Sequence, residues 1–381
     1  MSQSGMTAGT TTWSHTGYAQ RIHFGLDAVD RLNEVVREVG GRRALLVTTE
    51  GRLASDAGKR VVDRLGRALA SLFSGVRSHV PTSAVQAAVE QAQSDGVDCV
   101  VSFGGGSCAD LGKAVCYFVE QQAGTPGASY VDRPALPHVS IPTTYSGAEL
   151  TPFFGMTDEA ARAKSGGGGP TITPIAAIYD PTLTLDTPVR VSAETGMNAL
   201  AHGVECAYSP RRTPEAEAIA LACIERVART LPLVVAEPGD LTARVAMLEG
   251  AVLGGRCLQN ASMGVHHGLA QLVGGRTGIP HGLANGLILS SAVAFNADAV
   301  PYEMAAIARA LGGDDAVDAA AAAAIDRLRA AIGLPAGLRE CGVTEDDLDA
   351  VARLSQGNFS VQSNPRPVSE EDARRILAAA F

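Results

Sequence analysis

Three of the chain's eight histidines lie in one short segment, SMGVHHGLAQLVGGRTGIPHG, at residues 262–282. Two of them, His267 and His281, are fourteen positions apart, with glycines and a proline between them. Near neutral pH an imidazole can bind a metal ion or transfer a proton. The segment therefore indicates a metal site or a proton-handling site, and two solvated histidines on an ordinary helix are the alternative.

A second segment, MNALAHGVE at residues 197–205, places Asn198 and His202 four positions apart. On a helix this spacing puts both side chains on one face, with their Cβ atoms about 6 Å apart. The pair alone is too common to indicate a ligand site, but with His267 and His281 it predicts that three imidazoles and an amide converge. His266 directly precedes His267, so we expect its ring to point elsewhere and to serve packing or lie at the surface.

A glycine-rich turn stands earlier in the chain, in CVVSFGGGSCADLGKA at residues 99–114. Gly104, Gly105, Gly106 and Ser107 fall between an expected strand and an expected helix. Glycines let the backbone approach a ligand closely, and a helix N-terminus attracts a pyrophosphate. The spacing is not G-x-G-x-x-G, so the usual dinucleotide fingerprint is absent. The turn is interpreted as a phosphate site, with a purely structural tight turn as the alternative.

Three hydroxyl side chains follow a later apolar run. Thr143, Thr144 and Ser146 come at the end of the strand expected at 137–144, where ligands of open α/β sheets bind. They predict contacts to ribose or phosphate, and ordinary turn chemistry is the alternative.

The elements that must position these residues change in kind along the chain. Helices are predicted over 26–41, 58–73 and 82–96, and they alternate with strands over 42–50, 76–80 and 97–103, which predicts a parallel sheet. From about residue 190 helical patterns follow one another, including the alanine-rich run 314–333, and 165–170 is expected to be a flexible loop. The predicted domains are an α/β domain at 1–190 and an all-helical domain at 191–381.

Composition excludes several classes of protein. A net charge of −9 and a pI near 5.4 argue against a nucleic-acid partner. No apolar run approaches the roughly 20 residues that span a bilayer, and the N-terminal segment does not resemble a secretory signal. The seven cysteines are scattered and form no C-x-x-C pair, so neither a disulfide framework nor a zinc ribbon is indicated and a reducing cytoplasm is expected.

The chain resembles the iron-containing, or group III, alcohol dehydrogenase superfamily, and within it the maleylacetate reductase branch. The resemblance is carried, in order, by FGLDAVDRL, GGGSCADLGKA, PTTYSGAELTPFFGMTD, IYDPTLTLDTP, MNALAHGVE, the segment with His267 and His281, AFNADAVPYEMAAIARALG and NPRPVSEEDARRIL. It implies the dehydroquinate synthase-like fold: an α/β dinucleotide-binding domain with a parallel sheet, an all-α C-terminal domain, and a cleft between them for nicotinamide and substrate.

The resemblance also implies roles for single residues. Cofactor-binding positions map to Gly104, Gly105, Gly106, Ser107, Thr143, Thr144, Thr151 and Lys164, and metal positions map to Asn198, His202, His267 and His281. Metal-bearing relatives have an aspartate at the first of the metal positions. Asn198 removes that charge, so a divalent metal such as Fe or Zn is allowed but not favoured. The cluster is then expected to handle a proton and to bind substrate carboxylates.

Two positions depart from the family pattern in the substrate pocket, and a third bears on the choice of cofactor. Gln271, four residues after His267, and Ser291 in ILSSAVAFN replace histidines, and neither side chain shuttles protons near neutral pH. The pocket is therefore expected to bind a different substrate, to use fewer acids or to have lost redox turnover. The alternative is that both changes are drift in a tolerant pocket. Gln271 is a candidate catalytic residue. Thr49 stands where many NAD-specific relatives have an aspartate facing the ribose, with Glu50 as a substitute, so NADH and NADPH both stay open.

Together these observations predict an NAD(P)H-dependent oxidoreductase that resembles maleylacetate reductase and passes hydride to an unsaturated or oxo acid. For maleylacetate the product would be 3-oxoadipate. One alternative is a metal-dependent alcohol dehydrogenase or aldehyde reductase on the same fold. Another is a non-redox enzyme or binding protein that keeps the nucleotide fold. A small-molecule acid is the expected substrate, and a homodimer is expected by analogy with relatives.

Overall fold

Six parallel strands form the sheet of the N-terminal part, in the order β1-β8-β5-β4-β2-β3. The computed structural model describes residues 17–124, 134–159, 163–312 and 320–381. The strands are β1 (Arg21–Phe24), β2 (Ala44–Val47), β3 (Leu69–Phe73), β4 (Cys99–Gly104), β5 (His138–Pro142) and β8 (Ala176–Tyr179). Strands β2, β4, β5 and β8 are buried along their whole length, as expected of a parallel sheet covered on both faces. The predicted parallel sheet is confirmed.

Helices cover both faces of this sheet. They are α1 (Leu32–Glu38), α2 (Glu50–Ala54), α3 (Asp56–Leu65), α4 (Thr82–Ser94) and α5 (Gly106–Gln122). Successive residues of β2 point to opposite faces. Leu46 packs with Val61 of α3 in one apolar cluster, whereas Leu45 packs with Val89 of α4 and Leu111 of α5 in another. The two cores hold the carboxyl ends of the strands along one edge.

Two sequence predictions in this part are wrong. The helix predicted over 58–73 ends at Leu65, because Gly66 has a φ of 51° that leaves the helix, and residues 69–73 instead pair with β2 as β3. Residues 76–80, predicted as a strand, contain no strand. Sheet pairing outweighs the helix propensity of the alanine- and leucine-rich run.

The segment predicted to be a flexible loop at 165–170 is also different. It contributes to β7 (Ala163–Gly168), which pairs antiparallel with β6 (Phe153–Asp158). A Cβ at Gly167 would lie 3.1 Å from ring atoms of both Phe154 and Tyr117. The glycines therefore allow this hairpin to pack closely on aromatic side chains.

The C-terminal part is helical, and no strand follows β8 among the described residues. Its helices are α6 (Val189–Tyr208), α7 (Pro214–Ala236), α8 (Leu241–Asn260), α9 (Val265–Thr277), α10 (His281–Asn296), α11 (Pro301–Ala310), α12 (Ala320–Ala331), α13 (Glu345–Ser355), α14 (Phe359–Gln362) and α15 (Glu370–Ala379). The helix predicted over 314–333 is α12 where it is described; 314–319 lie outside the described residues. None of the helices in the described segments is long and apolar enough to cross a membrane.

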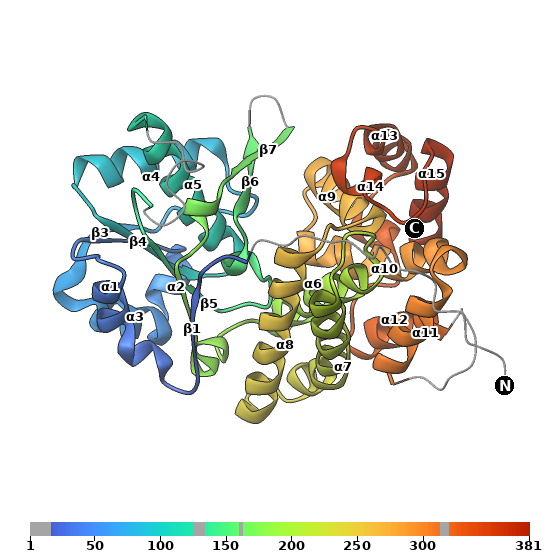
Figure 1. Cartoon of the computed structure of the whole chain (residues 1–381), viewed down its shortest axis with the longest axis horizontal. Coiled ribbons are helices and arrows are strands. Elements are labelled where there is room, and N and C mark those ends of the chain that lie inside the picture. The colour runs from blue at the N-terminus through green and yellow to red at the C-terminus, as the bar shows by residue number, and fades with distance from the viewer. Residues whose placement is uncertain (1–16, 125–133, 160–162, 313–319) are drawn as a thin grey trace.

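The two parts lie side by side, with α6 and α8 next to the sheet (Figure 1). The short 3₁₀ helix η4 (Ala148–Leu150) leads from the sheet towards α8. A Cβ on Gly147 would lie 2.7 Å from the Cα of Gly255, so the backbones meet there directly. The domain boundary predicted at 190/191 falls in the first turn of α6 and stays a prediction.

Candidate active site

The triple-glycine turn connects β4 to α5 at the carboxyl edge of the sheet. Gly104 ends β4 with a φ of 141°, and Gly105 is the N-cap of α5. Added Cβ atoms would lie 2.6 Å from Cys108 Sγ at Gly104 and 3.0 Å from Ser146 Oγ at Gly106. Only glycine leaves the space above this helix N-terminus open, which is where an anion binds. The predicted strand-turn-helix context is confirmed.

Hydroxyl groups without partners surround this turn. Thr143, Thr144 and Ser146 are placed by the end of β5, and the Oγ atom of each is buried with no hydrogen-bond partner. Buried polar atoms are normally satisfied, so these hydroxyls are available to hydrogen-bond a ligand bound at the turn. The glycine turn and these hydroxyls fit the ribose and phosphates of a dinucleotide, and their cofactor-binding roles stay predictions.

The other predicted cofactor-binding residues differ in their surroundings. The hydroxyl of Thr151 is buried and accepts a hydrogen bond from Lys113 Nζ at 2.9 Å. Thr49 is the N-cap of α2 and accepts from the backbone N–H of Arg52 at 3.2 Å. Ser107 lies in the first turn of α5. Lys164 lies on β7, and its side chain is outside the described part of the structure. Their roles toward the cofactor stay predictions.

The structure brings the predicted histidines together. Asn198 and His202 lie on α6, His267 is in the first turn of α9, and His281 is the first residue of α10, after Pro280. The rings of His202 and His267 stack with centroids 4.8 Å apart, and those of His267 and His281 are 6.1 Å apart. His202 and His267 are buried, whereas His281 is exposed. The cluster thus opens on the side of His281.

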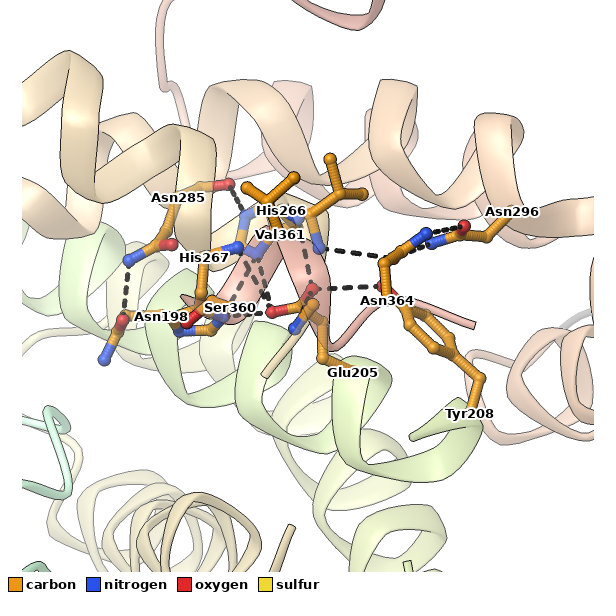
Figure 2. Close-up of polar contacts among 12 residues, drawn as sticks. Asn198, Glu205, Tyr208, His266, His267, Asn285, Asn296, Ser360, Val361 and Asn364 are labelled. Carbon is orange, nitrogen blue, oxygen red and sulfur yellow. Dashed lines mark hydrogen bonds and ion pairs between the residues drawn. The ribbon is translucent and has the colours of Figure 1, made fainter. Parts of the chain in front are cut away.

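The amide of Asn198 is fixed from two sides, and Figure 2 shows its contact with Asn285. Its Nδ2 donates to the carbonyl oxygen of Ser146 at 3.2 Å, and its Oδ1 accepts from Asn285 Nδ2 at 2.7 Å. The Ser146 carbonyl only accepts hydrogen bonds, so it determines which way the amide faces. An aspartate here would set a carboxylate oxygen against that carbonyl unless a cation lay between them.

Glu205 is the central residue that the sequence analysis missed. It lies on α6, fully inside the protein, and its Oε1 accepts from the backbone N–H groups of Gly264 at 3.0 Å and His266 at 3.1 Å. Its Oε2 accepts from the backbone N–H of His267 at 3.2 Å and contacts His267 Nδ1. The carboxylate therefore caps the N-terminus of α9 from another helix. Its position three residues after His202 was the available signal, because that spacing puts both on one face of α6.

Glu205 also determines the protonation of His267. Because the carboxylate only accepts, Nδ1 of His267 carries the proton, and Nε2 is left buried without a hydrogen-bond partner. His266 is buried too: its Nε2 donates to the carbonyl of Asn285 at 2.9 Å, and its ring lies edge-on to His267 at 4.9 Å. The expected packing role of His266 holds, but its ring does not point away from the cluster.

Burial controls the charge of this cluster. Burial lowers the pKa of His202, and the neighbouring imidazoles of His267 and His281 lower it further. Burial also lowers the pKa of His267, against the opposing attraction of Glu205. For Glu205, burial alone would raise the pKa, but the electrostatic interaction with His267 and hydrogen bonds from His266 and His267 outweigh it and hold the pKa well below its usual range. Near pH 7 the two buried imidazoles are neutral and the carboxylate is ionised.

These shifts predict that the fold loses stability in acid. Burial, with Lys113 nearby, also lowers the pKa of His138 to about 3. Below about pH 6.5 the buried histidines are protonated in the unfolded chain but not in the folded chain. As the pH falls, each of them therefore lowers the free energy of unfolding by up to about 1.4 kcal/mol per pH unit. The contribution of Glu205 is present above its unfolded pKa near 4.5 and is lost below it. Urea unfolding at pH 7.5, 6.5 and 5.5 should show a falling free energy of unfolding, with a smaller slope in His138→Asn. An unchanged free energy across this range would contradict the burial of these rings.

The two departures from the family pattern lie outside the buried cluster. Gln271 is one helical turn after His267 on α9, and its side chain is exposed. Ser291 donates its hydroxyl to the carbonyl of Ile288 in its own helix at 2.9 Å. The Ser291 hydroxyl therefore has its hydrogen-bond partner within its own helix. The catalytic role of Gln271 stays a prediction.

The four positions that the resemblance assigns to a metal do not fit a tightly held divalent ion. Their donor set has three neutral imidazoles and an amide whose oxygen already accepts from Asn285, so no ligand balances the ion's charge. Glu205, His266 and His267 also bring ligand atoms within 4.8 Å of one another. However, the oxygens of Glu205 are occupied by the backbone of α9. Neither group offers a charged ligand that is free.

The parallel sheet carries a glycine-rich turn, and the adjoining helices bring imidazoles together. These two parts define a dehydrogenase. A family model described as iron-containing alcohol dehydrogenase matches residues 19–181, and one described as the Fe-containing alcohol dehydrogenase family, C-terminal, matches residues 192–381. The chain belongs to the iron-containing alcohol dehydrogenase family, and it is an oxidoreductase.

The relatives place the chain within this family. It is 36% identical to a maleylacetate reductase from Rhizobium sp. over 96% of this chain and 97% of the relative. The crystal structure of maleylacetate reductase from Agrobacterium tumefaciens has a TM-score of 0.84 at 33% identity, covering 97% of this chain and 98% of that one. Sulfoacetaldehyde reductase from Bifidobacterium kashiwanohense, solved in complex with NAD+, has a TM-score of 0.85 at 25% identity, covering 96% and 98%. The chain is an oxidoreductase that resembles maleylacetate reductases.

Proposed function

We propose that this enzyme transfers hydride from NADH or NADPH to an unsaturated or oxo acid, with maleylacetate as the first substrate to test. The observation that carries the proposal is the uncharged amide of Asn198, held between Ser146 and Asn285 in a cluster of imidazoles. The maleylacetate reductases among the relatives support the substrate class, and the NAD+ complex of a relative supports the cofactor.

The chain's own residues have two tasks in such a reaction. The bound nicotinamide supplies the hydride. The glycine turn and the hydroxyls of Thr143 and Thr144 orient the nucleotide. When hydride adds to one carbon of a C=C bond, the other carbon must take a proton. The nucleotide supplies two electrons and one hydrogen as hydride and is thereby oxidised, and the protein must supply the second hydrogen as a proton. His267 Nε2 is buried, unpartnered and stacked on His202, which makes it our candidate for delivering that proton.

An acid substrate suits neutral imidazoles better than an alcohol does. A carboxylate entering the cluster places negative charge beside His202 and His267, which favours their protonated forms and raises their pKa values. The substrate thus supplies the charge that makes the proton available, whereas an uncharged aldehyde does not. We therefore propose that the enzyme works without a metal ion, a small-molecule acid being its substrate.

The test is nicotinamide absorbance with NADH and NADPH across maleylacetate, simple aldehydes and 2-enoate acids, with and without a chelator. We expect turnover of an acid that the chelator does not change. In the matched variant Asn198→Asp a carboxylate restores a charged ligand, so bound metal measured by elemental analysis should rise. Turnover of aldehydes only, abolished by the chelator, would establish the metal-dependent alternative. Nucleotide binding without oxidation of either cofactor would establish a non-redox role.

We further propose that the enzyme is a homodimer of the reducing cytoplasm. All seven cysteines are free, and six of them are buried, which supports a chain that needs no disulfide. Sedimentation at working concentrations tests the dimer.

A further inference from the structure

Arg52 crosses the carboxyl edge of the sheet beside the glycine turn. It lies on α2, directly after β2, and its Nη2 donates to Thr187 Oγ1 at 2.6 Å. Thr187 Oγ1 in turn donates to the carbonyl of Thr143, which follows β5, at 2.7 Å. Strands β2 and β5 are separated by β4, and neighbouring strands lie about 4.8 Å apart. The guanidinium therefore reaches over the end of β4, from which the glycine turn continues.

The charge of Arg52 is not balanced by a carboxylate in direct contact within the described part of the chain. The residue is half-buried, and it forms no ion pair with any residue that the structure describes. Burial lowers the pKa of Arg52, and Asp186 opposes this only from a distance. Arg60, on the neighbouring helix α3, makes a comparable contact to Thr182 Oγ1 at 3.2 Å but is also paired with Asp27 and Asp30 at 2.8 and 2.7 Å. A half-buried guanidinium with only a hydroxyl partner is typical of an anion site.

The position after β2 indicates which anion. In dinucleotide-binding sheets this position faces the ribose of the adenosine, where a carboxylate selects NADH and an arginine accommodates the 2′-phosphate of NADPH. Thr49 holds it here with an uncharged side chain, and its hydroxyl accepts from the backbone N–H of Arg52. The nearest acid along the chain is Glu50, which is exposed at the start of α2.

We propose that Arg52 binds the 2′-phosphate of the cofactor and makes NADPH the preferred reductant. This inference rests on the proposed function, because it assumes a nicotinamide nucleotide at the glycine turn. It adds a residue outside the predicted cofactor set and decides between two cofactors that the sequence leaves open.

The test is calorimetric binding of two fragments, 2′,5′-ADP and 5′-AMP, which needs no substrate and no turnover. The wild type should bind 2′,5′-ADP at least tenfold more tightly. Arg52→Gln should lose about 10- to 100-fold in affinity for 2′,5′-ADP, as expected for charge-assisted hydrogen bonds, with 5′-AMP within twofold. Arg52→Lys should recover part of the loss. Arg60→Gln is the matched control and should leave the ratio of the two affinities unchanged.

Each other result overturns the inference. Equal loss of both fragments in Arg52→Gln would mean that Arg52 contacts only the phosphates shared by both cofactors or holds α2 in place. Equal binding of both fragments to the wild type, with a gain for 2′,5′-ADP only in Glu50→Gln, would assign the ribose to Glu50 and NADH to the enzyme. Failure of both fragments to bind would overturn the proposed function as well.

Discussion

Replacing His267 by asparagine is expected to lower kcat/KM for the acid substrate by about 10²- to 10⁴-fold, the usual contribution of a general acid. The reason is geometric: Nδ1 is committed to Glu205, and Nε2 is buried without a hydrogen-bond partner among the residues that the structure describes. Steady-state kinetics with both reduced cofactors measures the effect. The pH profile of kcat/KM should also change, because the limb that reports the titration of this imidazole disappears.

The control for this variant is His23→Asn, which removes an imidazole on β1 that contacts Arg31 at 3.2 Å, away from the cluster. Its kcat/KM should stay within twofold of the wild type. If His267→Asn retains more than a third of the activity, His267 is not the proton donor, and His202 or His281 takes that place.

Glu205→Gln is expected to lower both the activity and the stability of the enzyme, although the two side chains have nearly the same shape. The two oxygens of Glu205 face five donors, three at Oε1 and two at Oε2, from Tyr208, Gly264, His266 and His267. Whichever way a glutamine amide turns, its NH₂ group faces at least two donors, so the N-terminus of α9 loses its cap and His267 loses its orientation. We expect kcat/KM to fall about 10- to 100-fold, as for other carboxylates that orient a functional histidine. The free energy of unfolding should fall by about 1–3 kcal/mol.

Glu149→Gln is the matched control, because Glu149 is also buried but contacts one side-chain donor, Tyr179 Oη, at 2.7 Å. Burial raises the pKa of Glu149, against the hydrogen bond from Tyr179, so a neutral amide should replace it at small cost. A fully active Glu205→Gln enzyme, stable at pH 7, would show that the carboxylate only fills space. A loss of activity with an unchanged pH profile would show that it holds α9 but does not act through His267.

Local patterns predicted most of the frame that carries the site. The buried runs of β2, β4 and β5 and the turn at Gly104–Gly106 could be located because strand periodicity and glycine requirements are local. The same reasoning failed at residues 66–80 and 165–170, where β3 and β7 form. In both places pairing with a partner strand, β2 or β6, outweighs local propensity.

The sequence alone determined the types and order of the chemical groups: imidazoles at 202, 267 and 281, an amide at 198, and an uncharged residue after β2. It also determined that Asn198 and His202 share a face, because helix spacing is local. Only the tertiary structure decided that Glu205 caps α9 and sets the tautomer of His267, and that Arg52 lies over the glycine turn. Those contacts join residues more than fifty positions apart, and a buried carboxylate or guanidinium acquires its role from the donors and acceptors that packing places around it.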